Sequence, residues 1–369
     1  MTMPTMQSPL EQLALFQGQA GVSDRELRDI SNRFASASEI DHRLFAAPRP
    51  NEIVRLADKV KRYTRSHGWM APDEARSLVD SWRDHALAQY DTRVNEGRIV
   101  LSLFDHTGQW SLPWEEAGYQ VVRFDIQDNP ETGDVNAFGV NFFADWFGDF
   151  DGLDIYAVLA ACPCTEFAIS GAKHFAAKDA DGRTVAAVEL VHQTLRTIEY
   201  YRPSVWAIEN PVGRIEKLAG LPPWRLAFDP HHLGDPYTKK TLLWGRFNSD
   251  LPIAPVEPTE GSKMHRKFGG NRLATKNARS ATPEGFSYGF FLANNAIDNP
   301  LMALANRYDR LNAQLLRAAL DANITASEID QLLADAYYMD LDDDAAECAL
   351  RQAITIQASH KSMIYGGTS

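Results

Sequence analysis

Four short apolar runs in the middle of the chain predict buried strands. They are RIVLSLF (98–104), QVVRFDIQ (120–127), LDIYAVLAA (153–161) and SVWAIEN (204–210). Between the last two runs, residues 184–203 carry apolar side chains at three-and-four spacing, which predicts a helix. Strands that alternate with helices favour an α/β domain with a doubly wound, mostly parallel, Rossmann-like sheet. Ligands of such sheets bind at the carboxyl ends of the strands.

A helical region is predicted before these strands, over residues 1–95. Ser23 and Glu26 have the spacing of a capping box, and a later helix is expected to end at Gly68. Pro72 stands in the first turn of the next helix, a position that proline favours. We interpret residues 1–95 as an accessory helical region.

A second helical region is predicted over residues 297–369, where Thr325 and Glu328 form another capping-box pair. Residues 96–296 then remain as the central α/β domain. Several aspartates lie within residues 340–344, but they lack the spacing of a calcium-binding loop, and no metal is expected there.

Composition narrows the class of protein. A chain of 369 residues is long enough for two or three folding units, and its three cysteines are too few for a disulfide framework. No apolar stretch is long enough to span a membrane and no signal-peptide pattern is present, so a cytoplasmic location is expected. The net charge of -12 argues against broad electrostatic attraction to nucleic acid.

The first two strands suggest a cofactor site. Gly108 lies in the turn after the first strand, where a glycine lets the backbone approach a ligand, and Asp125 ends the second strand. A carboxylate at that place typically binds a ribose diol, which together with the turn indicates an adenosine-containing cofactor. A further acid is expected near the adenine ring, and both Asp145 and Asp134 are candidates.

The next two strands suggest a reactive thiol and an acid. Cys164 follows Pro163 at a strand end, where backbone N–H groups can lower the pKa of a thiol. Glu209 ends the strand VWAIEN, and apolar surroundings are expected to raise its pKa. Cys162 favours a structural role; the alternative is a zinc site with Cys164, but no paired ligands follow at zinc spacing.

The order of these motifs resembles the cytosine C5 DNA methyltransferases that use S-adenosylmethionine, in the compact form found in bacteriophages and prophages. The resemblance covers about residues 98–295. Its segments are LFDHTGQWSLPWEEAG, VVRFDIQ, CPCTEFAISG, IENP, DPYTKKTLLWG and ARSATPEGFSYGFFLAN, the last expected to return to the cofactor.

The resemblance implies a class I methyltransferase sheet and a flipped cytosine from double-stranded DNA in a bacterial or phage-infected cytoplasm. Cys164 would add to C6 of the base while Glu209 binds the N3 edge. The implied catalytic residues are Cys164, Glu209, Asn210, Lys239 and Thr241. The implied cofactor-binding residues are Phe104, Asp105, Thr107, Gly108, Asp125, Ile126, Asp145 and Pro163.

The chain departs from the family at two motifs. Cys162 stands where the family usually has a proline before Pro163. The family's Gln-x-Arg-x-Arg motif corresponds here to Tyr237, Lys239 and Thr241, so one arginine that would hold the cytosine is lost. Lys240 is a candidate substitute.

The region expected to recognise the target, residues 246–280, is short. It contains a basic run, residues 261–280, with six Lys or Arg and no acid. This run favours a loop that follows phosphates rather than a segment that reads base edges. The expected DNA contacts are Lys173, His174, Lys240, Lys263, Arg266, Lys267 and Arg272, and Lys178 and Arg183 are in the same loop as Lys173. His174 is interpreted as a phosphate or backbone contact rather than as a general base.

Two alternatives remain open. The short recognition segment permits an RNA (tRNA) cytosine C5 methyltransferase with the same chemistry. The change at Thr241 permits a protein that keeps the fold and the cofactor and binds nucleic acid without turnover.

Overall fold

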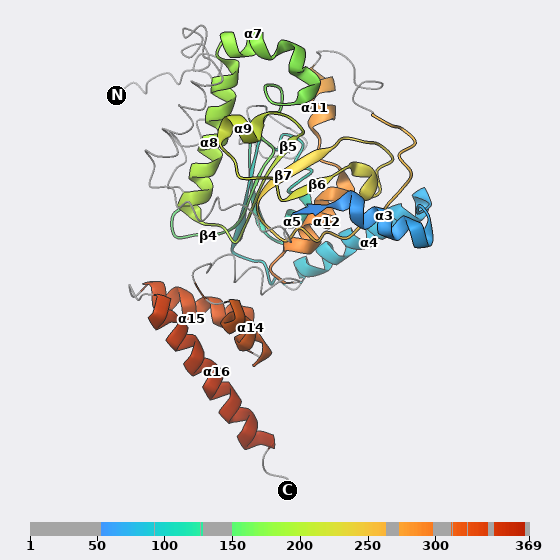
Figure 1. Cartoon of the computed structure of the whole chain (residues 1–369). Coiled ribbons are helices and arrows are strands. Elements are labelled where there is room, and N and C mark those ends of the chain that lie inside the picture. The colour runs from blue at the N-terminus through green and yellow to red at the C-terminus, as the bar shows by residue number, and fades with distance from the viewer. Residues whose placement is uncertain are drawn as a thin grey trace, which may run out of the picture. The chain divides into compact units, whose positions relative to one another are not determined.

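The computed structural model describes residues 53–91, 93–125, 127, 150–262, 273–297, 311, 313–322, 324–338 and 343–365 (Figure 1). The chain divides into two compact units, Met1–Ala293 and Asn294–Ser369. Among the described helices, none combines the length and the apolar character needed to cross a membrane.

The first unit is built on a mixed sheet of seven strands. The strands are β1 (Val54–Arg55), β2 (Arg98–Leu103), β3 (Gln120–Phe124), β4 (Asp154–Ala160), β5 (Val205–Pro211), β6 (Leu226–Phe228) and β7 (Thr241–Arg246). Their order is β1-β6-β7-β5-β4-β2-β3. All neighbouring pairs are parallel except those of β7, which runs antiparallel to β5 and β6. The predicted α/β class with a mostly parallel sheet is confirmed.

The strand order reverses beside β2. From β2 the chain forms β3 on one side and then crosses to form β4 on the other. The backbone N–H of Ala161, just after β4, donates to the carbonyl oxygen of Leu103 at the end of β2 (3.0 Å). Parallel sheets bind ligands where the order reverses in this way. A ligand site is therefore expected at the part of the sheet edge formed by the loops after β2, β4 and β5.

Helices cover both faces of the sheet. The first unit contains α3 (Leu56–His67), α4 (Pro72–Asp91), α5 (Leu112–Glu116), α7 (Phe175–Ala180), α8 (Arg183–Tyr201), α9 (Ile215–Ala219), α11 (Leu273–Ser280), α12 (Glu284–Asn294) and the 3-10 turns η2 (Ile169–His174) and η3 (Pro230–His232). Consecutive side chains of a strand point to opposite faces. In β4, Ile155 belongs to the apolar cluster that includes residues of α8, whereas Tyr156 contacts Trp114 of α5. Trp114 also packs edge-on against Phe291 of α12.

Several helix ends follow the sequence signals. α3 ends before Gly68, whose backbone has a φ of 77° and whose N–H donates to the Thr64 carbonyl (2.9 Å). α4 begins at Pro72. In the second unit, Glu328 accepts from the backbone N–H of Thr325 (2.8 Å), and the Glu328 N–H donates to the Thr325 hydroxyl (3.2 Å). This capping box is confirmed.

The region before β2 also contributes to the sheet. Val54 of β1 pairs with Leu226 of β6, so the described part of residues 1–95 carries an edge strand in addition to its helices. Arg83 of α4 forms an ion pair with Glu116 at the end of α5 (2.6 Å). These contacts attach α3 and α4 to the central sheet.

The second unit has a core of its own. It contains α14 (Ala313–Asp321), α15 (Ala326–Tyr338) and α16 (Asp343–Tyr365). Fully buried side chains from all three helices, among them Leu316, Leu333 and Leu350, form one apolar cluster. The prediction of a helical region there is confirmed for the described residues.

Candidate functional site

A tight turn after β4 presents Cys164. The backbone N–H groups of Phe167 and Ala168 both donate to the Cys164 carbonyl oxygen (3.0 and 2.8 Å). Pro163 is exposed and Cys164 is partly buried. Burial raises the pKa of the Cys164 thiol, while the positive charge of Lys239 opposes the rise. A backbone hydrogen bond lowers this pKa, in the expected direction, but burial outweighs it and the net shift is upward.

Cys162 has a different environment. It is only 2% exposed and belongs to the apolar core that α8 covers, and its sulfur lies 3.8 Å from the Thr194 hydroxyl. Burial raises the pKa of Cys162 to about 12, so the thiol stays protonated at neutral pH. These features support the structural interpretation of Cys162.

Glu209 and Asn210 lie at the end of β5, one strand away from the Cys164 turn. Burial raises the pKa of the partly buried Glu209 carboxyl, and Lys239 partly offsets this. The fully buried Asn210 donates from Nδ2 to the Cys162 carbonyl oxygen (2.8 Å). This bond fixes the Pro-Cys turn against the strand that carries Glu209.

Lys239 is the third member of this group. Its Nζ donates to the carbonyl oxygen of Arg279 in α11 (3.2 Å), which directs the long side chain. Its charge lowers the pKa of both Cys164 and Glu209. A thiol, a carboxyl and an ammonium group therefore lie within electrostatic reach of one another at the sheet edge.

Thr241 does not extend this group. Its side chain is 2% exposed and donates to the Lys239 carbonyl oxygen (2.9 Å), so the hydroxyl is engaged inside the fold. Tyr237 is also buried, and Lys240 is exposed. Of the residues predicted from this motif, Lys239 and Lys240 have amino groups that can face a substrate.

The turn after β2 has the backbone expected of a cofactor loop. Phe104 and Gly108 both adopt positive φ values, 61° and 66°. The Gly108 N–H donates to the Asp105 carbonyl (3.0 Å), which closes the turn, and Thr107 is partly buried within it. A turn of this kind leaves room for a ligand close to the main chain.

Asp105 supports this turn from inside. Its carboxylate accepts hydrogen bonds from the hydroxyl groups of Ser102 (2.8 Å) and Ser111 (2.7 Å) and is only 5% exposed. The Asp105 side chain thus holds the loop, and the cofactor contact that the resemblance implies for Asp105 stays a prediction.

Asp125 lies at the end of β3, next to the same turn. Its carboxylate accepts from the Gln127 N–H (2.8 Å). Burial raises the pKa of Asp125, whereas the Gln127 hydrogen bond and the charge of His106 oppose the rise. Because Asp125 follows the end of β3, a ribose diol could donate to its carboxylate there.

α11 contacts both halves of the site. Asn277 donates to the Gln127 side chain (3.0 Å) beside Asp125, and Arg279 accepts from Lys239 (3.2 Å). A loop was expected here, and for residues 273–280 that expectation is wrong. The stretch LATKNARS contains no glycine or proline and several strong helix formers, so a short helix is favoured.

The candidate nucleic-acid contacts differ in their exposure. Lys173 and His174 are exposed at the end of η2, ten residues or less beyond Cys164. Lys178 is buried beside Glu166, and Arg183 is paired with Asp181, so neither cation is available without breaking those contacts. Four further nucleic-acid candidates lie outside the described residues: Lys263, Arg266, Lys267 and Arg272. The cofactor candidates Ile126, Asp134 and Asp145 also lie outside them.

One cluster among the described residues has metal-ligand chemistry, namely Asp229, His231 and His232, whose ligand atoms lie within 4.8 Å of one another. It contains neither Cys162 nor Cys164. Asp229 and His232 form the capping box of η3, in which the Asp229 N–H donates to His232 Nδ1 (3.0 Å). We therefore assign these two residues to the turn.

No protein-family model matches this chain, and no curated protein matches it.

Proposed function

We propose that the protein is a DNA cytosine C5 methyltransferase that uses S-adenosylmethionine. The observation that carries the proposal is the meeting of Cys164, Glu209 and Lys239 at the carboxyl edge of a mostly parallel sheet. The sheet, with β7 reversed between β5 and β6, is compatible with the class I methyltransferase sheet that the sequence resemblance implies.

The residues at the first two strand ends fit the cofactor. The Phe104–Gly108 turn can bring backbone close to it, and the Asp125 carboxylate is placed at the strand end where it can accept from its ribose hydroxyls. When bound, S-adenosylmethionine supplies an electrophilic methyl group.

Side chains of the protein would activate the cytosine and provide the nucleophile. Burial raises the pKa of Glu209, which favours the protonated carboxyl, and the O–H of that form can donate to N3 of a cytosine. This hydrogen bond draws electrons from the ring and makes C6 electrophilic. The Cys164 thiol would give its proton to solvent water as its sulfur bonds to C6, and the nearby Lys239 charge would stabilise the thiolate. The electrons of the C5–C6 double bond would then be available at C5 for the methyl group that the bound cofactor would supply. Transfer of the C5 proton to water would re-form the double bond and break the bond between C6 and the Cys164 sulfur.

A cytosine within a duplex cannot reach this edge, so the base would have to leave the stack. Lys173, His174 and Lys240 are exposed near the site and are suited to bind phosphates on either side of the flipped nucleotide.

The proposal is tested with tritiated S-adenosylmethionine and either unmodified DNA or unmodified tRNA. Label in DNA supports the proposal, and label in tRNA alone points to the RNA enzyme. Cofactor binding without transfer to either substrate identifies the impaired protein.

Two serine variants assign the nucleophile. Cys164→Ser should abolish transfer and also the covalent adduct with DNA that contains 5-fluorocytosine, while cofactor binding remains. Cys162→Ser is the matched control and should stay active, because its thiol is buried in the core. Loss of the adduct in Cys162→Ser alone would contradict the assignment.

A further inference from the structure

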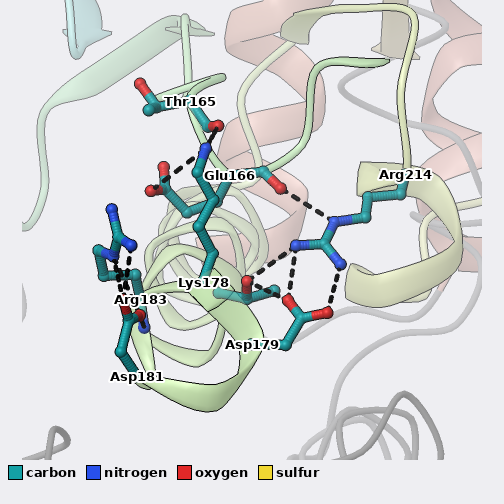
Figure 2. A network of polar contacts seen from close by, with 8 residues as sticks. Thr165, Glu166, Lys178, Asp179, Asp181, Arg183 and Arg214 are labelled. Atoms are coloured by element: carbon teal, nitrogen blue, oxygen red, sulfur yellow. Dashed lines mark hydrogen bonds and ion pairs between the residues drawn. The ribbon is translucent and has the colours of Figure 1, made fainter. Parts of the chain in front are cut away.

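Arg214 joins the Cys164 loop to the loop after β5 (Figure 2). Its Nε donates to the Glu166 carbonyl oxygen (3.0 Å). Its two terminal nitrogens bind both carboxylate oxygens of Asp179 (2.8 and 2.6 Å), and one of them also donates to the Thr184 hydroxyl (2.9 Å). The guanidinium group lies 3.8 Å from the centre of the Phe175 ring, which restricts it further.

Each end of this contact lies close to a catalytic candidate. Glu166 is two residues beyond Cys164, and Arg214 is five residues beyond Glu209. The two loops also share backbone hydrogen bonds, from Arg214 N–H to Phe167 (3.0 Å) and from Ile169 N–H to Val212 (3.0 Å). Between them, Gly213 packs so closely that an added Cβ would lie 2.0 Å from the Phe167 carbonyl oxygen.

The Arg214–Asp179 pair is shielded from solvent, whereas a neighbouring pair is not. The side chains of Arg214 and Asp179 are 14% and 19% exposed, against 45% and 43% for Arg183 and Asp181. Burial raises the pKa of Asp179, but the hydrogen bonds from Arg214 and Thr184 outweigh it and leave the pKa lowered. A shielded, two-pronged pair holds its geometry better than an exposed one.

We propose that Arg214 is a positioning residue that fixes the Cys164 sulfur at the distance from Glu209 needed for attack on a bound base. This inference rests on the proposed function. It also predicts a property of the thiol that does not depend on methyl transfer, because a released loop would expose Cys164 to water and to small electrophiles.

The test compares two arginine variants in full-length protein carrying Cys348→Ser, which removes the exposed cysteine. The rate of Cys164 alkylation by iodoacetamide is measured from pH 6 to 10, with Cys162 alkylation as the indicator of unfolding. For Arg214→Gln we expect faster alkylation, about threefold or more, and a lower apparent thiol pKa, because burial is what raises it. Arg183→Gln makes the same change of charge in the exposed pair and should match the parent protein.

Formation of the 5-fluorocytosine adduct should change in the opposite direction in Arg214→Gln. A displacement of about 1 Å can cost about 100-fold in rate, so the adduct should form more slowly although the thiol is more accessible. Arg214→Lys keeps the charge but cannot bind Asp179 and Glu166 together. Its rate of adduct formation should therefore lie between those of the parent protein and Arg214→Gln. If the parent protein forms no adduct, the proposed function fails, and the alkylation profile still tests the positioning role.

Unchanged alkylation and an unchanged pH midpoint in folded Arg214→Gln would overturn the inference. If Arg214→Gln unfolds, as alkylation of Cys162 would reveal, Arg214→Lys decides in the same way.

Discussion

Asn210 donates a hydrogen bond to the carbonyl oxygen of Cys162 across a distance of 2.8 Å. The bond connects the end of β5 to the turn after β4, two strands that are adjacent and parallel in the sheet. The Asn210 side chain is fully buried, so water cannot replace it as a donor. The position of the Cys164 turn therefore depends on a single amide as well as on the Arg214 contact.

Replacement of this amide should affect both stability and chemistry. In Asn210→Ala, the Cys162 carbonyl loses its donor, and we expect the free energy of unfolding to fall by about 1 to 3 kcal/mol. Methyl transfer should fall further than stability explains, because the turn is no longer fixed. Urea unfolding and initial rates measure the two effects, and full activity in Asn210→Ala would contradict the role given to the bond.

The pKa of Glu209 makes stability depend on pH. Because its pKa is raised in the folded protein, the folded state binds more protons than the unfolded state between the unfolded and folded pKa values. The contribution of Glu209 to stability is therefore full below the unfolded pKa and is lost as the pH rises through the folded one. Glu209→Gln should be more stable than the parent protein at neutral pH, equally stable at low pH, and inactive. Urea midpoints over pH 4 to 8 check this, and a constant difference would argue against a buried, protonated Glu209.

Lys239 and Lys240 form a matched pair for separating thiol activation from DNA binding. Lys239 lowers the pKa of Cys164, so Lys239→Gln should raise that pKa and reduce kcat by about 100-fold. Lys240 is exposed, and Lys240→Gln should raise KM for DNA and leave the thiol titration unchanged. Steady-state kinetics and the pH dependence of alkylation distinguish these results. Equal effects of the two variants on the thiol would contradict the assignment.

Asp125 provides a test of the cofactor half. Asp125→Asn should weaken binding of S-adenosylmethionine by about 10- to 100-fold, the value of one or two hydrogen bonds to a charged acceptor. Asp151→Asn is the control, since its carboxylate binds the Tyr200 hydroxyl (2.8 Å) at an exposed position. Equilibrium dialysis measures both, and equal affinities for the two variants would remove Asp125 from the site.

The central strands can be predicted from the sequence because a buried strand appears in it as a continuous run of apolar residues. The run LDIYAVLAA is apolar at every position except Asp154, which is typical of strands covered on both faces. The meeting of Cys164 and Glu209 is also predictable, since the carboxyl ends of parallel strands share an edge. β1 was not foreseen, because its two residues, Val54 and Arg55, stand inside a helical pattern and pair with a strand far along the chain.

The sequence does not predict which groups the side chains at the motif positions contact. Asp105 and Thr241 occupy motif positions, yet both bind groups inside the fold, Ser102 and Ser111 for the first and the Lys239 carbonyl for the second. The Arg214–Asp179 contact was missed because its partners are 35 residues apart and each stands among other charges. A direction set by tertiary partners has no periodic pattern from which it could be read.

The close approach of Gly213 to Phe167 sets the spacing between the two loops. Even a methyl group at Gly213 would clash with the Phe167 carbonyl and push the loop that carries the thiol away from the strand that carries the carboxyl. The segment from Glu209 to Arg214 thus tolerates no added side-chain bulk at Gly213. Variants meant to change what binds at this edge would keep that segment and alter the exposed turn around Lys173 instead.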